Sequence, residues 1–168
     1  RLILKQTGGL EQLCKLSYRR LTNFPGFGLA RFASLHAGIE IGRRIMFDAD
    51  FSIGMRLENS RSAENYLKKA LFCLDREVFA CLFLDNRHKV LAFHVISGGT
   101  IDRATVYPRE IVRRVIDHNA AAVIFSHNHP SGSAEPSESD KSLTLLLKSA
   151  LSLIDVSVLD HFIVAGDE

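Results

Sequence analysis

The sequence predicts an α/β fold, in which a mixed β-sheet is flanked by helices and preceded by a small all-α module. The first 45 residues carry apolar side chains at helical spacing. From residue 62 onward, helical patterns alternate with short β-prone runs, and two of these runs are separated by a polar loop typical of a hairpin. With 168 residues and 46% hydrophobic content, the chain can bury one core and carry a small appended module.

The predicted N-terminal module covers residues 1–45 and consists of two helices joined by a glycine turn. Leucines recur at close to helical spacing over residues 9–22, and a second helical pattern covers about residues 29–45. Between them, residues 24–28 read Phe-Pro-Gly-Phe-Gly and break the helix. Residues 46–61 follow neither period, so the sequence predicts a linker there.

Residues 62–168 are predicted to form the α/β domain. A helix is expected from Ser62 to about Asp75, followed by the strands Val78–Leu84 and Val90–Ile96 as an antiparallel hairpin. The later elements are a helix from Pro108 to about Asn119, a strand at Ala121–Phe125, a helix that starts at Ser137, and strand-like runs at Val156–Leu159 and Phe162–Ala165. The spacing in the helix after Ser137 predicts that Leu143, Leu146, Leu147, Ala150 and Leu151 point inward.

Charge and cysteine usage narrow the functional class. Residues 1–62 hold ten Lys/Arg against five Asp/Glu, whereas residues 63–168 hold eleven against fourteen. The basic front part is therefore the candidate for nucleic-acid binding. The three cysteines form no Cys-x-x-Cys pair, which favours a reducing cytoplasm over a secreted disulfide framework.

The sequence gives no sign of a membrane protein. No apolar run approaches the length of a membrane span, and no signal peptide precedes the first module. The chain opens on Arg1 rather than Met and stops just after an apolar run. We therefore expect a fragment trimmed at both ends, with the α/β domain cut short at its C-terminus.

The most informative motif follows the strand predicted at residues 121–125. His127 and His129 are two residues apart, and Asp140 follows at the start of the next helix. On an extended segment the two imidazoles face the same side while Asn128 points away, so both can reach one ion. Three protein ligands leave a coordination position open for water, as in catalytic zinc sites.

Each part of this motif also has a simpler explanation. Two histidines at a strand end can be ordinary surface residues. Ser137 and Asp140 form a capping-box arrangement, in which the carboxylate only closes the helix end. The metal interpretation is favoured because all these features, with Pro130 and Gly132 in the loop between them, would otherwise have to coincide.

A hydrolytic metal site also needs a general base. Glu77 is the best candidate, because a carboxylate at the head of an apolar strand is costly unless it lies at an edge or in a polar cleft. The simpler alternative is an exposed glutamate at a strand end, and spacing alone does not separate Glu77 from Asp75 or Asp85.

These motifs resemble a known family. Residues 127–132 (His-Asn-His-Pro-Ser-Gly) and 136–140 (Pro-Ser-Glu-Ser-Asp) are similar to the JAB/MPN metalloprotease motif of the JAMM type. The Asn-His-Pro-Ser-Gly variant resembles the RadC family in particular. Further similar segments are Asp75-Arg76-Glu77, Tyr107-Pro108-Arg109-Glu110, His118-Asn119-Ala120-Ala121 and Leu159-Asp160-His161, so the resemblance covers roughly residues 60–168.

The resemblance implies a JAB/MPN fold, which is cytidine-deaminase-like, and one Zn²⁺ ion. Residues matching His127, His129 and Asp140 would hold the zinc, with water as the fourth ligand. A residue matching Glu77 would be the general base, and one matching Ser137 would help to hold the oxyanion or the water. The implied activity is hydrolysis of an amide or isopeptide bond in a peptide or protein substrate.

The other histidines are weaker candidates. His161 follows Asp160 near the last strand-like run, where it either orients a ligand or is an ordinary buried histidine. The remaining histidines, His36, His88, His94 and His118, have no spacing that recommends them as metal ligands.

The glycine turn of the first module resembles the helix-hairpin-helix motif found ahead of the metal domain in RadC-like proteins. Gly26 and Gly28 would let backbone N–H groups approach a DNA phosphate, and Arg31 would add charge. Leu29 stands where a lysine would strengthen the case, and a hairpin that only packs against protein is the alternative.

Two other functions remain open from the sequence. The chain could be a DNA-associated accessory protein in repair or recombination, with the metal domain as a scaffold. It could also be a metal-dependent nuclease, although phosphodiester cleavage more often uses two metals and more carboxylates than this motif offers.

Overall fold

The structure is a computed structural model that describes residues 2–14, 16–50, 53–71, 74, 76–98, 106–130 and 132–165. The chain divides into two compact units, Arg1–Asp50 and Phe51–Glu168. The mixed sheet flanked by helices in the second unit, together with the helical first unit, confirms the predicted fold class.

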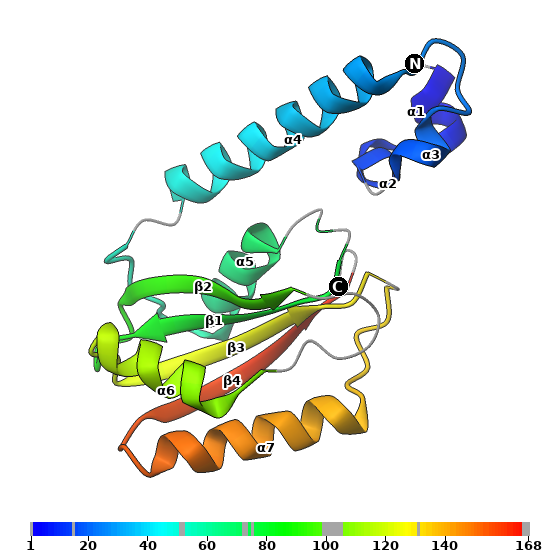
Figure 1. Ribbon diagram of the computed structural model, residues 1–168. Coiled ribbons are helices and arrows are strands. Elements are labelled where there is room, and N and C mark those ends of the chain that lie inside the picture. Colours follow the sequence, from blue (N-terminus) through cyan, green and yellow to red (C-terminus); the bar gives the residue numbers. More distant parts are fainter. Residues whose placement is uncertain are drawn as a thin grey trace. The chain divides into compact units, whose positions relative to one another are not determined.

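The first unit is helical throughout its regular elements (Figure 1). Its helices are α1 (Leu2–Thr7), α2 (Leu10–Cys14), α3 (Tyr18–Leu21) and α4 (Leu29–Asp50). Leu13 and Leu21 are buried, and the ring of Tyr18 packs edge-on against Phe32 with centroids 5.3 Å apart. These contacts give the unit a small core between the short helices and the start of α4.

Two boundaries in this part of the chain differ from the sequence prediction. The single helix predicted over residues 9–22 is wrong, because the chain adopts an extended conformation at Ser17 and so separates α2 from α3. Helix α4 continues to Asp50, so the first third of the predicted linker is helical.

The described part of the remaining linker, residues 53–61, is bound to the second unit. The backbone N–H of Gly54 donates to the carbonyl of Val90 at 2.8 Å, and the N–H of Leu57 donates to the carbonyl of His88 at 2.9 Å. The side chain of Leu57 is buried. This segment therefore covers the start of a strand instead of spanning open solvent, which the mixed polar composition of residues 46–61 did not reveal.

The second unit is built on a four-stranded sheet with the order β2-β1-β3-β4. Its elements are α5 (Ser60–Ala70), β1 (Val78–Leu84), β2 (Val90–Gly98), α6 (Pro108–Asp117), β3 (Ala122–Asn128), α7 (Glu138–Ser152) and β4 (Ser157–Val164). β1 pairs antiparallel with both β2 and β3, whereas β3 and β4 are parallel. All seven residues of β1 and of β3 are buried, because both faces of these central strands are covered.

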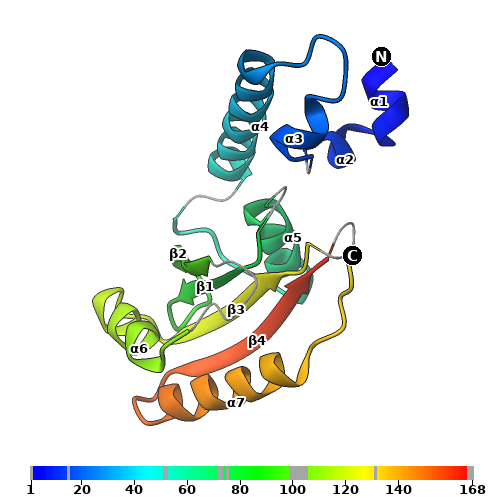
Figure 2. The ribbon, with the colours of Figure 1, turned by 45° about the vertical axis from the view of Figure 1, so that its right-hand side comes forward.

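Helices cover the two faces of the sheet unequally. Helix α5 lies on one face, and α6 and α7 lie on the other (Figures 1 and 2). The larger core cluster joins odd-numbered residues of β1 and β3, such as Phe83 and Phe125, to Leu147 and Leu151 of α7. Burying large side chains of this kind contributes about 1.5–3 kcal/mol each, so this α7 face anchors the domain.

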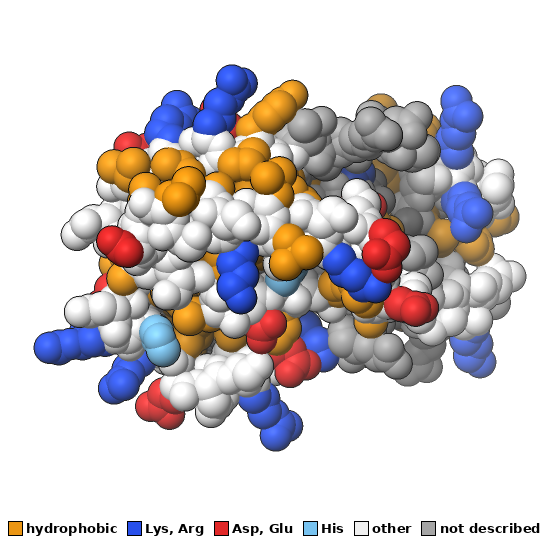
Figure 3. Space-filling view, turned by 90° about the horizontal axis from the view of Figure 1, so that it is seen from below, with side chains coloured by type: hydrophobic (Ala, Val, Ile, Leu, Met, Phe, Trp, Pro, Cys, Tyr) orange, Lys and Arg blue, Asp and Glu red, His pale blue; other side chains and the backbone are white. Residues whose placement is uncertain are grey.

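The α6 and α7 face also has an exposed apolar surface (Figure 3). Its members are Ile116, Leu145, Leu146 and Leu153, each more than half exposed. Leu146 was expected to point inward from its spacing on the helix. It lies outside because Leu147 and Leu151 alone reach the sheet as fully buried side chains of α7.

Two details of the predicted elements also change. Helix α5 begins two residues earlier than predicted, because Asn59 is its N-cap. Ser62 is the third residue of the helix and completes the capping box. The two strand-like runs predicted between residues 156 and 165 form one continuous strand, β4, parallel to β3.

Candidate metal centre

The sheet topology brings three segments that are distant in sequence to the same end of the sheet. Because β1 runs antiparallel to β3, the start of β1 lies beside the end of β3, where Phe79 pairs with His127. The parallel pairing of β4 places His161 opposite Phe125, one strand further along. The N-terminus of α7 adds Asp140, so candidate residues from four elements meet at this end of the sheet.

The two motif histidines face each other as the sequence predicted. The Nε2 atoms of His127 and His129 are 2.9 Å apart, and the ring of His127 is only 3% exposed. Asp140 contacts both rings, with Oδ1 at 3.5 Å from His127 Nε2 and Oδ2 at 3.9 Å from His129 Nε2.

The hydrogen bonds around these rings fix which nitrogen carries the proton. Nδ1 of His129 lies 2.6 Å from the carbonyl oxygen of Ser133. A carbonyl can only accept, so Nδ1 must be the donor, and Nε2 of the neutral ring then presents a lone pair.

A longer chain of hydrogen bonds fixes the tautomer of His127 in the same way. The hydroxyl of Thr144 donates to the carbonyl of Asp140 at 2.7 Å, so it must accept from Nδ1 of His161, 2.6 Å away. Nε2 of His161 is then the acceptor for Nδ1 of His127 at 2.9 Å. Nε2 of His127 is therefore left with its lone pair toward His129.

Three unprotonated ligand atoms thus converge on one point. They are Nε2 of His127, Nε2 of His129 and Oδ1 of Asp140. Lone pairs this close repel each other unless a proton or a cation lies among them. Neutral imidazoles with the other nitrogen hydrogen-bonded are the usual form of histidine metal ligands, so the donor set fits a divalent ion.

Burial makes protonation of these rings an unfavourable way to relieve the repulsion between the lone pairs. Desolvation lowers the pKa of His127, partly opposed by the nearby carboxylate of Asp140. Desolvation, aided by His127, also lowers the pKa of His161 to about 4, which keeps this ring neutral in the hydrogen-bond chain. Burial alone would raise the pKa of Asp140, but hydrogen bonds from Ser137 and the two histidines outweigh it and hold the carboxyl ionised.

Ser137 has the capping role that was the simpler alternative for this segment. Its backbone N–H and its hydroxyl both donate to Oδ2 of Asp140, at 2.8 and 2.6 Å, and its hydroxyl oxygen accepts from the Asp140 N–H. The capping box and the ligand geometry coexist, because the cap uses Oδ2 and leaves Oδ1 to face Nε2 of His127. The hydroxyl proton of Ser137 is committed to Asp140.

Glu77 lies beside the histidine pair. One carboxylate oxygen of Glu77 and one nitrogen each of His127 and His129 all lie within 4.8 Å of one another. Glu77 is exposed, whereas Val78 next to it is buried, so its carboxylate stands at the rim of the site. The group could bind a metal ion, and a carboxylate at this distance can also reach a water molecule held between the ligands.

Sequence reasoning missed two contributors to this arrangement. Thr144 and the carbonyl of Ser133 hold the histidine tautomers, yet neither was singled out. Thr144 could have been found, since it lies four residues after Asp140 and thus on the same face of the helix. Of the two interpretations of His161, the structure favours the orienting one.

In the first unit, the three predicted DNA contacts lie in and beside the α3–α4 turn. Gly26 has a φ of +79°, a left-handed conformation that favours glycine. Its carbonyl accepts from Nη1 of Arg31 at 2.6 Å. Gly28 is exposed and accepts from the N–H of Phe32 at the start of α4.

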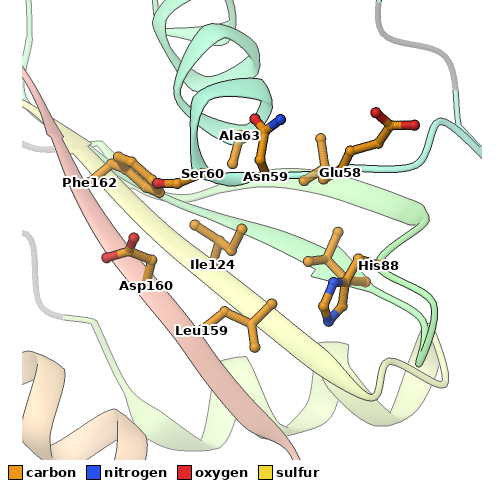
Figure 4. A pocket seen from close by; sticks show the side chains of 11 residues that line it. Glu58, Asn59, Ser60, Ala63, His88, Ile124, Leu159, Asp160 and Phe162 are labelled. Atoms are coloured by element: carbon orange, nitrogen blue, oxygen red, sulfur yellow. The ribbon is translucent and has the colours of Figure 1, made fainter.

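A separate hollow of about 310 Å³ lies on the α5 face (Figure 4). Its floor is apolar, with Ile124, Leu159 and Phe162, and Asp160 and His88 lie at its margin. None of the candidate metal ligands lines it. In the part of the chain that the structure describes, no helix is long and apolar enough to cross a membrane.

Comparison with known proteins gives a family for the second unit. The RadC-like JAB domain matches residues 57–168, which include every candidate metal ligand and Glu77. A domain of this kind suggests a JAB-type metal-dependent hydrolase.

Curated relatives match almost the whole chain. A UPF0758 protein of Alcanivorax borkumensis is 51% identical over 98% of this chain and 72% of its own length. UPF0758 proteins of Stutzerimonas stutzeri and Pseudomonas putida are each 48% identical, over 100% and 99% of this chain and 75% and 73% of their own lengths. The chain belongs to the RadC family.

Proposed function

We propose that the second unit is a zinc-dependent hydrolase that cleaves peptide or isopeptide bonds. The observation that carries this proposal is the convergence of three unprotonated ligand atoms, from His127, His129 and Asp140, with the carboxylate of Glu77 beside them. Nitrogen and oxygen ligands with an open position are typical of catalytic zinc. The RadC-like JAB domain supports the hydrolase class.

The residues have separate roles in this reaction. A zinc ion held by His127, His129 and Asp140 would polarise the substrate carbonyl and lower the pKa of a water in the open position to about 7. Glu77 accepts the proton of the attacking water on its carboxylate and returns it to the nitrogen of the leaving amine. Ser137 keeps Asp140 oriented through Oδ2, since its hydroxyl proton is already donated there.

The test combines metal analysis with a peptide library. The zinc-loaded protein is incubated with fluorogenic linear and isopeptide-linked substrates, next to the Glu77→Gln variant. We expect one zinc per chain in both proteins and cleavage that is slower in the variant by about 100–10,000-fold, the usual contribution of a general base. Glu77→Gln with full activity would remove Glu77 as the base.

The same experiment separates the other two functions. A protein that binds no metal after loading would favour the accessory role, with the domain as a scaffold. A metal-loaded protein that cleaves DNA and leaves every peptide intact would favour the nuclease.

We further propose that the first unit binds DNA through the turn before α4. The exposed backbone at Gly26 and Gly28 leads into the N-terminus of a 22-residue helix, where N–H groups favour a phosphate. Arg19 and Arg20 are exposed on α3. Such contacts are independent of DNA sequence and weaken with salt.

This second proposal is tested by DNA affinity across a salt series. The double change Arg19→Gln and Arg20→Gln is expected to weaken binding at low salt and to flatten the salt dependence, because it removes two phosphate contacts. Lys148→Gln, an exposed change on α7, is the matched control. Equal affinity of all three proteins would contradict the assignment.

A further inference from the structure

One side chain connects the histidine pair to the segment that carries Glu77. Asn128 stands between the two histidines at the end of β3, and it is 5% exposed. Its Oδ1 accepts from the N–H of Val78 at 2.9 Å. Its Nδ2 donates to the carbonyl of Arg76 at 2.9 Å and lies 3.5 Å from the carbonyl of Leu74. The two short bonds reach the residues on either side of Glu77.

These bonds continue the link between β1 and β3 where the ladder between the two strands ends. The pairing of β1 with β3 ends at Phe79 opposite His127. Glu77 lies two residues beyond that point, outside the ladder, and its own side chain is exposed. The amide of Asn128 therefore bonds the backbone on both sides of Glu77 from the β3 side, about 50 positions later in the chain, while Val78 also pairs with Gly98 of β2.

The alternation of side chains along the strand makes this coupling direct. His127 faces the ligand cluster, and Asn128 points to the opposite side of β3, toward Val78. A displacement of β3 would thus move the histidines and the Glu77 segment together. Asn128 thus links the end of β3 that carries the histidines to the segment that carries Glu77.

We propose that Asn128 is a positioning residue that holds Glu77 in register with the metal ligands. The proposal rests on the hydrolase function and deepens it. Removing the amide would free the backbone around Glu77 without removing any ligand atom. Misplacing a reacting group by about 1 Å can cost roughly 100-fold in rate, so the effect falls on kcat more than on KM.

The first test uses hydrogen exchange and metal affinity, which need no substrate. In Asn128→Ala, the amide of Val78 loses its acceptor and is expected to exchange faster. Zinc affinity stays within about threefold, because all ligand atoms remain. Asn86→Ala, an exposed change in the β1–β2 turn, is the matched control and leaves both measurements unchanged.

The second test is a double-mutant cycle on the zinc-loaded enzyme. Asn128→Ala alone is expected to lower kcat about 10–100-fold with KM within twofold. In the Glu77→Gln background it adds no further loss, because a residue that acts only through Glu77 has no effect once the base is gone. A full additional loss in that background would overturn the positioning role.

A conservative variant protects the test against loss of folding. Asn128→Gln keeps both the acceptor for Val78 and the donor for the carbonyl of Arg76 but moves them by one methylene group, so it should fold and show an intermediate loss of kcat. If neither variant folds, Asn128 serves stability and the proposal is wrong. If the wild type cleaves no amide but Asn128→Ala still speeds hydrogen exchange at the Val78 amide, the hydrolase proposal fails. The hydrogen bond between Asn128 and Val78 is then supported on its own.

Discussion

Among the histidines that the structure describes, two pairs have their Nε2 atoms in contact with each other, and only one of these pairs has the features of a metal centre. Nε2 of His127 lies 2.9 Å from Nε2 of His129, and Nε2 of His94 lies 2.8 Å from Nε2 of His118. The second pair is stacked, with ring centroids 4.9 Å apart. A close contact between two imidazoles is therefore not sufficient to identify a ligand set.

The surroundings distinguish the two pairs. The first pair has Asp140 against both rings and Glu77 nearby. Among the described residues, it is also the only pair that belongs to a group of three or more metal-ligand side chains. Around the second pair, burial and the positive charge of Arg114 both lower the pKa of His94. A cation would be repelled there and attracted at the first pair.

The largest expected difference between the two pairs is in zinc affinity after one imidazole ring of each pair is removed. His127→Ala should weaken zinc binding by more than about 100-fold, since changes in partners behind a ligand already cost about 10–100-fold. His118→Ala should leave zinc affinity unchanged within error. Titration calorimetry with zinc on both variants decides this, and equal losses would end the distinction between the pairs.

The pH dependence of the metal-free protein should reveal the buried His161. Its pKa is lowered to about 4, so the unfolded state, with a histidine pKa of about 6.5, binds more protons between these values. The free energy of unfolding should be highest above pH 6.5 and fall toward pH 4, by at most about 3 kcal/mol from this residue.

Chemical denaturation across this pH range, with a chelator present, measures the effect. His161→Gln should flatten the curve between pH 6.5 and 4. Part of the slope remains in that variant, because burial also lowers the pKa values of His127 and His94. A variant with an unchanged slope would show that His161 is not held neutral.

A smaller loss of zinc affinity is expected when Thr144, the hydrogen-bond partner of His161, is changed. Thr144→Val removes the acceptor for Nδ1 of His161 while keeping the shape of the side chain. The tautomer of His127 is then no longer fixed, and zinc affinity should fall about 10–100-fold. Thr144→Ser, which keeps the hydroxyl, should bind zinc like the wild type; a loss in both would indicate packing instead.

The smallest effect concerns the stability provided by the second pair. His118→Ala removes a partly buried hydrogen bond to His94 and should lower the free energy of unfolding by about 1 kcal/mol. Thermal and urea denaturation measure it. A change in zinc affinity in the same variant would show that the two pairs are coupled through the sheet.

The candidate ligands could be singled out from the sequence because they follow local rules. The two-residue spacing of His127 and His129 and the helix start at Ser137 are read within 14 residues of sequence. The hairpin of β1 and β2 was likewise marked by the polar loop between two apolar runs. In these regions, local propensity and the final structure agree.

What the sequence did not reveal depends on register between distant strands. His161 reaches His127 only because β4 is parallel to β3, and no local pattern specifies that pairing. The start of α5 was misplaced because Asn59 and Ser62 are both good capping residues, and both take part in the same capping box. The break after α2 was missed because the leucine spacing continues through it.

The arrangement of the site along the chain has a consequence for folding. The three ligands lie between residues 127 and 140, so only a short loop must close to bring them together. Glu77 joins them only after β1 has paired with a strand more than 40 residues later, a slower non-local step. For the proposed zinc hydrolase, a newly made or partly opened domain would therefore bind its ion before it can cleave a substrate, and hydrolysis would begin only in a chain whose sheet is complete.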